Sequence, residues 1–110
     1  MYEENDYIMR QIKAMVRGLG KFMGLEQIKD LLQLNEDQQV SMTDKELETI
    51  IAVSKLELIL ANSHVAVNEL AVKTDINEER LQKLLDNKVI ATEQELEKLN
   101  AFINQNQQYL

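Results

Sequence analysis

The sequence contains no cysteine, no proline and no tryptophan, and only 5% of its 110 residues are aromatic. Without cysteine it forms neither a disulfide nor a thiolate metal site, which is typical of proteins in a reducing compartment. Without proline it lacks the residue that most often interrupts a helix. We therefore expect uninterrupted helices and no disulfide scaffold.

Membrane and export signals are also absent from the sequence. No apolar run approaches the ~20 residues that a membrane-spanning helix needs. The opening segment, MYEEND, is acidic, whereas a secretory signal begins with basic residues. We expect a cytoplasmic protein and do not expect it to bind a membrane.

The residues that are present are typical of a small helical protein. The length suits one domain, and helix-favouring Leu, Glu, Gln, Lys and Met are abundant. We predict a single all-α domain over residues 1–110, a small bundle of about five helices. A basic amphipathic helix and a short second helix occupy residues 1–34 in this prediction, and an acidic helical body occupies residues 43–106.

Charge is unevenly distributed along the chain. The net charge is −7, yet residues 1–34 carry as many basic as acidic side chains, so residues 35–110 hold the whole excess. Between Tyr7 and Leu25 there are four basic residues and no acidic one. Because the rest of the chain is acidic and this helix is basic, we expect the helix to contact an acidic protein surface.

The basic helix predicted over residues 7–23 has two distinct faces. At about 100° per residue, its basic side chains share one edge and a broad apolar arc lies opposite. A core helix with a solvated basic edge has the same pattern, and so does a helix that lies on an anionic membrane. Because the edge has no acid of its own, we predict a homodimer through this helix. The residues predicted to contact the partner are Arg10, Lys13, Arg17, Lys21, Ile12, Met15 and Leu19.

All three glycines lie in the segment GLGKFMG, residues 18–24. Their spacing does not match a dinucleotide-binding fingerprint, and Phe22 follows Lys21 where a P-loop needs Ser or Thr. We predict instead that Gly24 ends the helix as a left-handed cap. Gly20 and Gly24 also offer small side chains at which another helix could approach closely.

A helix that is apolar on every side is predicted after Thr43. Thr43 and Glu46 have the spacing of a capping box, and the apolar residues from Leu47 to Leu60 point all round the helix axis. Such a helix is buried on all sides. We expect it to be the central element, covered by the other helices or by a second copy of the chain.

Three shorter amphipathic helices are predicted in VNELAVKT, NEERLQKLLDNK and TEQELEKLNAFINQNQQ. Asn77 is placed to cap the second of them, and Thr92 with Glu95 forms another capping box at the start of the third. We expect loops at NEDQQVS, HVAV and KVIA, and a frayed end in NQNQQYL.

Within this half, an ELA triplet at Glu69–Ala71 is followed by Ile76 after a turn and by an apolar anchor at Leu81. In these residues the region 47–105 resembles the Cro/C1-type helix-turn-helix repressors, and TEQELEKLNAFI is similar to their closing helix. The resemblance implies a tri-helical C-terminal half and a DNA-binding transcriptional regulator. Asp75 stands where the family has glycine at the turn, a conformation that Asp tolerates better than most residues.

Charge argues against DNA binding by this half. Residues 47–105 carry six Lys or Arg against ten Asp or Glu, whereas affinity for DNA depends on neutralising phosphates. Nucleic acid is therefore the alternative partner and not the expected one. If the resemblance extends to function, the residues that contact DNA are Asn77, Arg80 and Lys83.

Two further resemblances carry no activity. Residues 80–98 resemble the bacterial oligomerisation segment known as SHOCT, with Asn87 and Lys88 at its usual turn glycine and Leu96 in place of its aromatic residue. The residues that correspond are Leu84, Leu85, Ile90, Thr92 and Glu95. The segment NDYIMRQIKAMVRGLGKF resembles the opening of a family of uncharacterised proteins from Gram-positive bacteria.

We find no pattern for catalysis, a cofactor or a metal. His64 is the only histidine, and no other metal ligand stands near it at helical spacing. Ser63 beside it makes no triad without a second base and an orienting acid. The expected function is a non-enzymatic interaction, oligomerisation or regulatory module. The alternatives are a helix-turn-helix regulator and a peripheral membrane protein held by the basic helix.

Overall fold

The computed structural model describes residues 2–32 and 42–110. No strand occurs in these two ranges, so the prediction of an all-α fold is confirmed. The predicted loop over residues 35–41 lies outside the described residues. In chain order the elements are α1 (Tyr2–Leu19), the short 3-10 helix η1 (Gly20–Phe22), α2 (Leu25–Leu32), α3 (Asp44–Ser63), α4 (Val67–Thr74), α5 (Glu78–Leu85), α6 (Glu93–Gln105) and a second 3-10 helix, η2 (Gln107–Tyr109).

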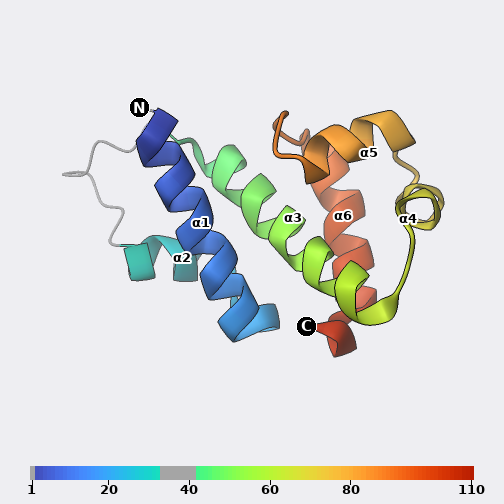
Figure 1. The fold of residues 1–110 in the computed structure, drawn as a ribbon, viewed down its shortest axis with the longest axis horizontal. Coiled ribbons are helices and arrows are strands. Elements are labelled where there is room, and N and C mark those ends of the chain that lie inside the picture. Colours follow the sequence, from blue (N-terminus) through green and yellow to red (C-terminus); the bar gives the residue numbers. More distant parts are fainter. Residues whose placement is uncertain (1, 33–41) are drawn as a thin grey trace.

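Helix α3 is the central element, as its apolar composition predicts. It runs between α1 and α2 on one side and α4, α5 and α6 on the other (Figure 1). Its buried residues lie around the whole helix and include Ile51, Val53 and Leu56. The cover comes from helices of the same chain. The need to bury α3 therefore gives no reason for a second copy.

Two apolar clusters pack against the two ends of α3. The N-terminal cluster is formed by Ile8, Ile12, Val16, Met23, Ile28, Leu47, Ile50 and Ile51. The C-terminal cluster is formed by Ala52, Leu56, Ile59, Leu70, Ile76, Leu81, Leu84, Ala91, Leu96, Leu99, Phe102 and Ile103. Burial of these apolar side chains is the main force that holds the helices together.

The helix starts agree with the sequence. In each predicted capping box the glutamate N–H donates to the threonine hydroxyl at 3.1 Å, from Glu46 to Thr43 at α3 and from Glu95 to Thr92 at α6. Asn77 caps α5 as expected. Each of these bonds satisfies a backbone N–H that the helix itself leaves unpaired.

Three helices are followed by a left-handed residue that is not glycine. These residues are His64 after α3, Asp75 after α4 and Asn87 near the end of α5, with φ values of 62°, 57° and 58°. Asn, Asp and His enter this region more readily than other side chains. His64, predicted to have no role, therefore ends α3, and its N–H donates to the carbonyl of Leu60 at 3.1 Å.

The end of α1 differs from the prediction. The α-helix stops at Leu19, and Gly20, with φ 54°, is the left-handed residue in place of Gly24. Gly24 lies just before α2, where its N–H donates to the side chain of Gln27 at 3.1 Å. Periodicity located the helix but not its end, because three glycines in seven residues offer several stopping points.

The C-terminal residues are also more ordered than predicted. Instead of fraying they form η2, and the carbonyl of Tyr109 accepts a hydrogen bond from Asn62 Nδ2 at 2.7 Å. A Cβ on Gly20 would lie 3.0 Å from the carbonyl oxygen of Leu110. The close approach predicted at Gly20 is therefore made by the main chain of the C-terminus and not by another helix.

Candidate functional site

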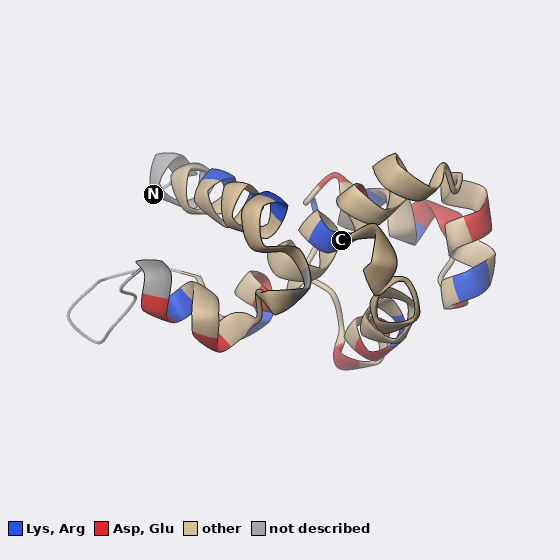
Figure 2. Cartoon of the chain, turned by 90° about the horizontal axis from the view of Figure 1, so that it is seen from below, with Lys and Arg blue, Asp and Glu red and all other residues tan. Residues whose placement is uncertain are grey.

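The exposed side of α1 and η1 forms one candidate surface. The α1 outer face consists of the exposed residues Tyr7, Arg10, Ala14, Arg17, Gly18, Leu19 and Phe22. Tyr7 is 58% exposed, Leu19 48% and Phe22 72%. From Tyr7 to Leu19, α1 has basic residues and no acidic one, and Figure 2 shows only basic positions along the coloured part of this helix, in contrast to the mixed charges elsewhere. The face is thus both basic and partly apolar.

The structure separates the residues predicted to contact a partner. Arg10, Arg17 and Leu19 are exposed on the α1 outer face, and Met15 is half-buried beside the N-terminal cluster. Ile12 is fully buried in that cluster, so the prediction that it contacts a partner is wrong. At the helix periodicity the apolar arc of α1 faces α3, which leaves only its margin for another molecule. The side chain of Lys21 lies outside the described residues.

The sequence suggested that the basic edge has no acidic partner within the chain, but Lys13 has one. Its Nζ lies 3.5 Å from Glu57 Oε1 on α3. The two side chains span a groove between α1 and α3 with a volume of about 240 Å³. The residues that line the groove are Lys13, Arg17, Ser54, Glu57, Leu58 and Ala61. The basic edge therefore has one charge paired within the chain, and Arg10 and Arg17 have no ion pair among the described residues.

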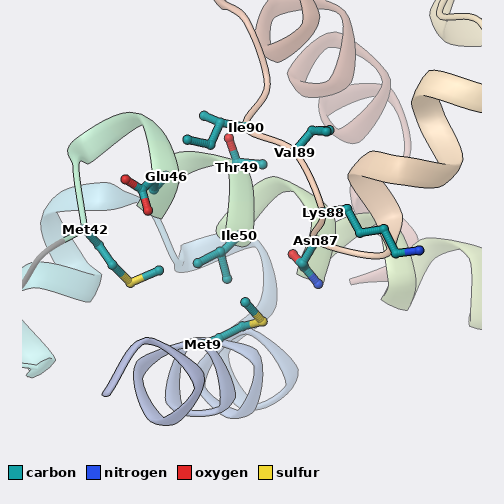
Figure 3. A pocket seen from close by; sticks show the side chains of 9 residues that line it. All are labelled: Met9, Met42, Glu46, Thr49, Ile50, Asn87, Lys88, Val89 and Ile90. Atoms are coloured by element: carbon teal, nitrogen blue, oxygen red, sulfur yellow. The ribbon is translucent and has the colours of Figure 1, made fainter. Parts of the chain in front are cut away.

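A second pocket opens where α1, the start of α3 and the α5–α6 loop meet (Figure 3). Its volume is about 110 Å³, and its lining residues are Met9, Met42, Glu46, Thr49, Ile50, Asn87, Lys88, Val89 and Ile90. Thr49 Oγ1 donates to the carbonyl of Lys45 at 2.8 Å and accepts from the N–H of Ala91 at 3.1 Å. This pair of bonds fixes the α5–α6 loop to α3. No sequence pattern indicates this pocket, because its walls come from segments far apart in the chain.

The residues that were candidates for DNA contact have structural partners. Asn77 Oδ1 accepts from the backbone N–H groups of Glu79 and Arg80 at 2.9 and 3.4 Å. The Arg80 guanidinium holds both oxygens of Glu95 at 2.8 and 2.9 Å and also donates to the carbonyl of Ile90 at 3.0 Å. Of the three candidates, only the side chain of Lys83 extends into solvent without a hydrogen bond or ion pair among the described residues.

The contact between Arg80 and Glu95 shifts the pKa of both side chains. The hydrogen bond between them is the main cause that raises the pKa of Arg80 and lowers the pKa of Glu95. Glu95 also accepts from the N–H of Thr92 at 3.0 Å in its capping box. One carboxylate therefore joins α5, the α5–α6 loop and the start of α6. Periodicity arguments do not detect this pair, because Arg80 and Glu95 are fifteen positions apart in the sequence.

The residues that suggested a helix-turn-helix domain occupy buried positions. Leu70 and Leu81 are fully buried, and Ile76 is 6% exposed. In Figure 1 α4 is seen nearly end-on while α5 lies across the view, so the two helices cross steeply. The left-handed Asp75 occupies the turn between them. A helix-turn-helix function stays a prediction, because packing of this kind does not by itself create a DNA-binding surface.

The described residues contain no group of three or more His, Cys, Asp or Glu side chains that could hold a metal ion. Lys55 on α3 is half-buried, and desolvation lowers the pKa of its ammonium, but it lines neither pocket. Within residues 2–32 and 42–110, no helix is long and apolar enough to cross a bilayer.

Comparison of the chain with protein-family models, with curated proteins and with solved structures gave no match. The α1 outer face, the second pocket and the fold of the chain are therefore the basis for proposing a function.

Proposed function

We propose that this chain is a non-enzymatic protein-interaction module of the cytoplasm. Its α1 outer face binds an acidic surface of a partner protein. The observation that carries the proposal is the composition of that face. It combines exposed Arg10 and Arg17 with exposed apolar side chains, and from Tyr7 to Phe22 it has no acid. Exposed aromatic and arginine side chains are enriched where proteins bind one another.

The partner that fits this face best is a second copy of the chain. Residues 35–110 carry the whole net charge of −7. Their exposed acids include Glu78 and Glu79 on α5 and Glu93 and Glu97 on α6. Complementary charge favours contact between α1 of one copy and this acidic half of the other.

Direct contact between two α1 faces is less favourable. Arg10 and Arg17 would then meet their own counterparts, and like charges in an interface oppose association. Charge mainly sets the orientation and rate of binding, so burial of Tyr7, Leu19 and Phe22 supplies most of the free energy. Ile12 contributes nothing here because it is already buried within the chain.

DNA binding by α5 receives less support from the residues. Arg80 is held by Glu95 and the Ile90 carbonyl, and Glu78 and Glu79 are exposed at the start of the same helix. A helix with this surface repels phosphate groups. Of the three candidates for DNA contact, Lys83 is the one that has an exposed basic side chain.

The first test is sedimentation equilibrium of the intact chain at tens of micromolar. We expect a dimer, and we expect the variant Leu19→Asp to be monomeric because it places a charge in the proposed contact. Val72→Asp is the matched control, since Val72 is an exposed apolar residue on α4, away from α1. A monomeric intact chain, or equal behaviour of both variants, contradicts the proposal.

The second test separates local charge from net charge. Replacing both Arg10 and Arg17 by Glu should abolish the dimer. Replacing both Lys45 and Lys73 by Glu changes the net charge equally but alters exposed residues of α3 and α4, outside α1, α5 and α6, and should leave the dimer intact. Flotation with anionic liposomes is run in parallel. Liposome binding that depends on Arg10 and Arg17, with no dimer in solution, would assign the face to a membrane and overturn the proposal.

A further inference from the structure

The groove between α1 and α3 contains a basic side chain whose neighbouring position on α3 has no acid. The two helices run in the same direction (Figure 1), and Lys13 Nζ lies 3.5 Å from Glu57 Oε1. One turn further along each helix, Arg17 and Ala61 line the same groove. Arg17 is exposed and makes no ion pair or hydrogen bond within the described part of the chain. A carboxylate beside Arg17 must therefore come from another molecule.

The rest of the groove suits an apolar group. The Ser54 hydroxyl donates to the Ile50 carbonyl at 2.7 Å, so its proton is already used. Leu58 is half-buried and Ala61 is exposed, and both line the groove. A volume of about 240 Å³ equals that of roughly eight water molecules at ~30 Å³ each, which is room for an aliphatic side chain. The group that fits here combines a carboxylate for Arg17 with an aliphatic side chain.

The chain itself carries such a pair of groups around the α5–α6 loop. Ile90 is 48% exposed, and Glu93, three residues later, is exposed at the start of α6. Two hydrogen bonds fix the loop between them and the rest of the fold. The Ile90 carbonyl accepts from Arg80 Nη2 at 3.0 Å, and the Ala91 N–H donates to Thr49 Oγ1 at 3.1 Å. A side chain that projects from a fixed loop loses less freedom on binding than one on a flexible loop.

The groove and the α5–α6 loop border the same face of α3. Ile50 lines the pocket next to Ile90, while Ser54, Glu57 and Ala61 line the groove. These four α3 residues follow the spacing of a single helix face. One interface can therefore include both features, and a two-fold axis between them would place the loop of each copy at the groove of the other.

We propose that two copies of the chain bind reciprocally, with Ile90 of each copy in the groove between α1 and α3 of the other. The Glu93 carboxylate pairs with the Arg17 guanidinium, whose planar fork matches a carboxylate. Ile90 lies against Leu58 and Ala61. The inference rests on the proposed function, because it names the part of the acidic half that the basic helix binds.

Exchange of charge tests the contact between Arg17 and Glu93. Arg17→Glu and Glu93→Arg each place like charges in both contacts of a reciprocal dimer. In sedimentation equilibrium each variant should dimerise about tenfold more weakly or worse. Glu69→Arg makes the same charge change on the exposed surface of α4 and should leave the dimer unchanged. Glu93→Arg that dimerises as the parent does would overturn the inference.

A mixture of the two charge variants gives a sharper result. In a mixed dimer of Arg17→Glu with Glu93→Arg, one contact has its charges exchanged and the other is native, so both are attractive. We expect the mixture to dimerise about as well as the parent, although each variant alone does not. A mixture that stays monomeric contradicts the reciprocal arrangement.

Two matched pairs of substitutions test the apolar part of the contact. Ile90→Ser should weaken the dimer about tenfold or more, whereas Val72→Ser makes a comparable change at the exposed surface of α4 and should not. Ala61→Glu places an acid of the same chain beside Arg17 and should also weaken the dimer. Asn68→Glu adds the same charge on α4 and serves as its control. Ala61 is exposed and glutamate favours helices, so Ala61→Glu should fold as the parent does.

The outcomes separate this inference from the proposed function. A parent chain that is monomeric at tens of micromolar overturns both. A parent dimer that Leu19→Asp disrupts, but that Ile90→Ser and Ala61→Glu leave intact, supports the proposed function and overturns the inference. The acidic surface bound by α1 would then lie away from the α5–α6 loop.

Discussion

The two ends of α3 are held in different ways. At its start, α1 and α2 pack through the N-terminal cluster, whose members are aliphatic side chains and methionine. At its end, α4, α5 and α6 pack through a larger cluster that includes the aromatic ring of Phe102. The same helix therefore packs in two apolar clusters, and the C-terminal cluster buries more apolar side chains than the N-terminal one.

The polar contacts differ in the same direction. The C-terminal half has a bidentate ion pair between Arg80 and Glu95, whose side chains are 33% and 15% exposed. The N-terminal half has the 3.5 Å contact of Lys13 with Glu57 and the contact of Lys29 with Asp44, whose carboxylate is 62% exposed. Exposed single contacts of this kind add little stability. The comparison indicates that the N-terminal half depends on apolar packing almost alone and should open first.

The largest expected effect comes from removing one fully buried side chain from each cluster. Ile12→Ala and Leu99→Ala should each lower the free energy of unfolding by about 2–5 kcal/mol, as buried large-to-small changes do. Hydrogen exchange should then separate the halves. Ile12→Ala should accelerate exchange mainly in α1 and α2, and Leu99→Ala should accelerate it throughout. Identical exchange patterns in the two variants would show that the halves open as one unit.

A smaller effect is expected from the contact between Arg80 and Glu95. Arg80→Met removes charge-assisted hydrogen bonds and leaves a largely buried carboxylate, so it should cost about 1–3 kcal/mol in thermal or denaturant unfolding. Lys29→Met is the control on an exposed contact and should change stability little. A larger loss for Lys29→Met than for Arg80→Met would reverse the comparison.

The same contact gives a pH dependence. Because the pKa of Glu95 is lowered in the fold, its contribution to stability is fully present above the ordinary pKa of a glutamate, about 4.3, and is lost as the pH falls through the lowered value. Glu95→Gln should therefore lose less stability on acidification than the parent. Thermal unfolding between neutral and acidic pH measures the difference, and parallel profiles would contradict it.

The smallest effect concerns the point where the two halves touch. Gly20→Ala should destabilise the chain by about 1–2 kcal/mol, since alanine is strained at φ 54° and its Cβ would lie 3.0 Å from the Leu110 carbonyl. Gly18→Ala is the matched change in open space within α1, and should stabilise by up to about 1 kcal/mol. Chemical denaturation of both variants tests the difference in sign, and two effects of the same sign would contradict it.

Local sequence patterns fixed the helices because the signals they use act within a few residues. Capping boxes span four positions, and the all-round apolar character of residues 47–60 is visible without any partner. The same reasoning placed the end of α1 wrongly, because Gly20 and Gly24 both satisfy the local rule for a cap. The structure adds that Gly20 also lies against the main chain of Leu110, which no local pattern indicates.

By itself, then, the sequence determined that this protein is all-α, that α3 is its centre, and where most of its helices begin. Only the tertiary structure decided which side chains remain available. It buried Ile12, joined Lys13 to Glu57, committed Arg80 to Glu95, and buried the Asn87 oxygen without a hydrogen bond from the described residues. The physical reason is distance along the chain. Helix formation depends on residues three or four positions apart, whereas burial and ion pairing depend on residues that meet only when the helices pack.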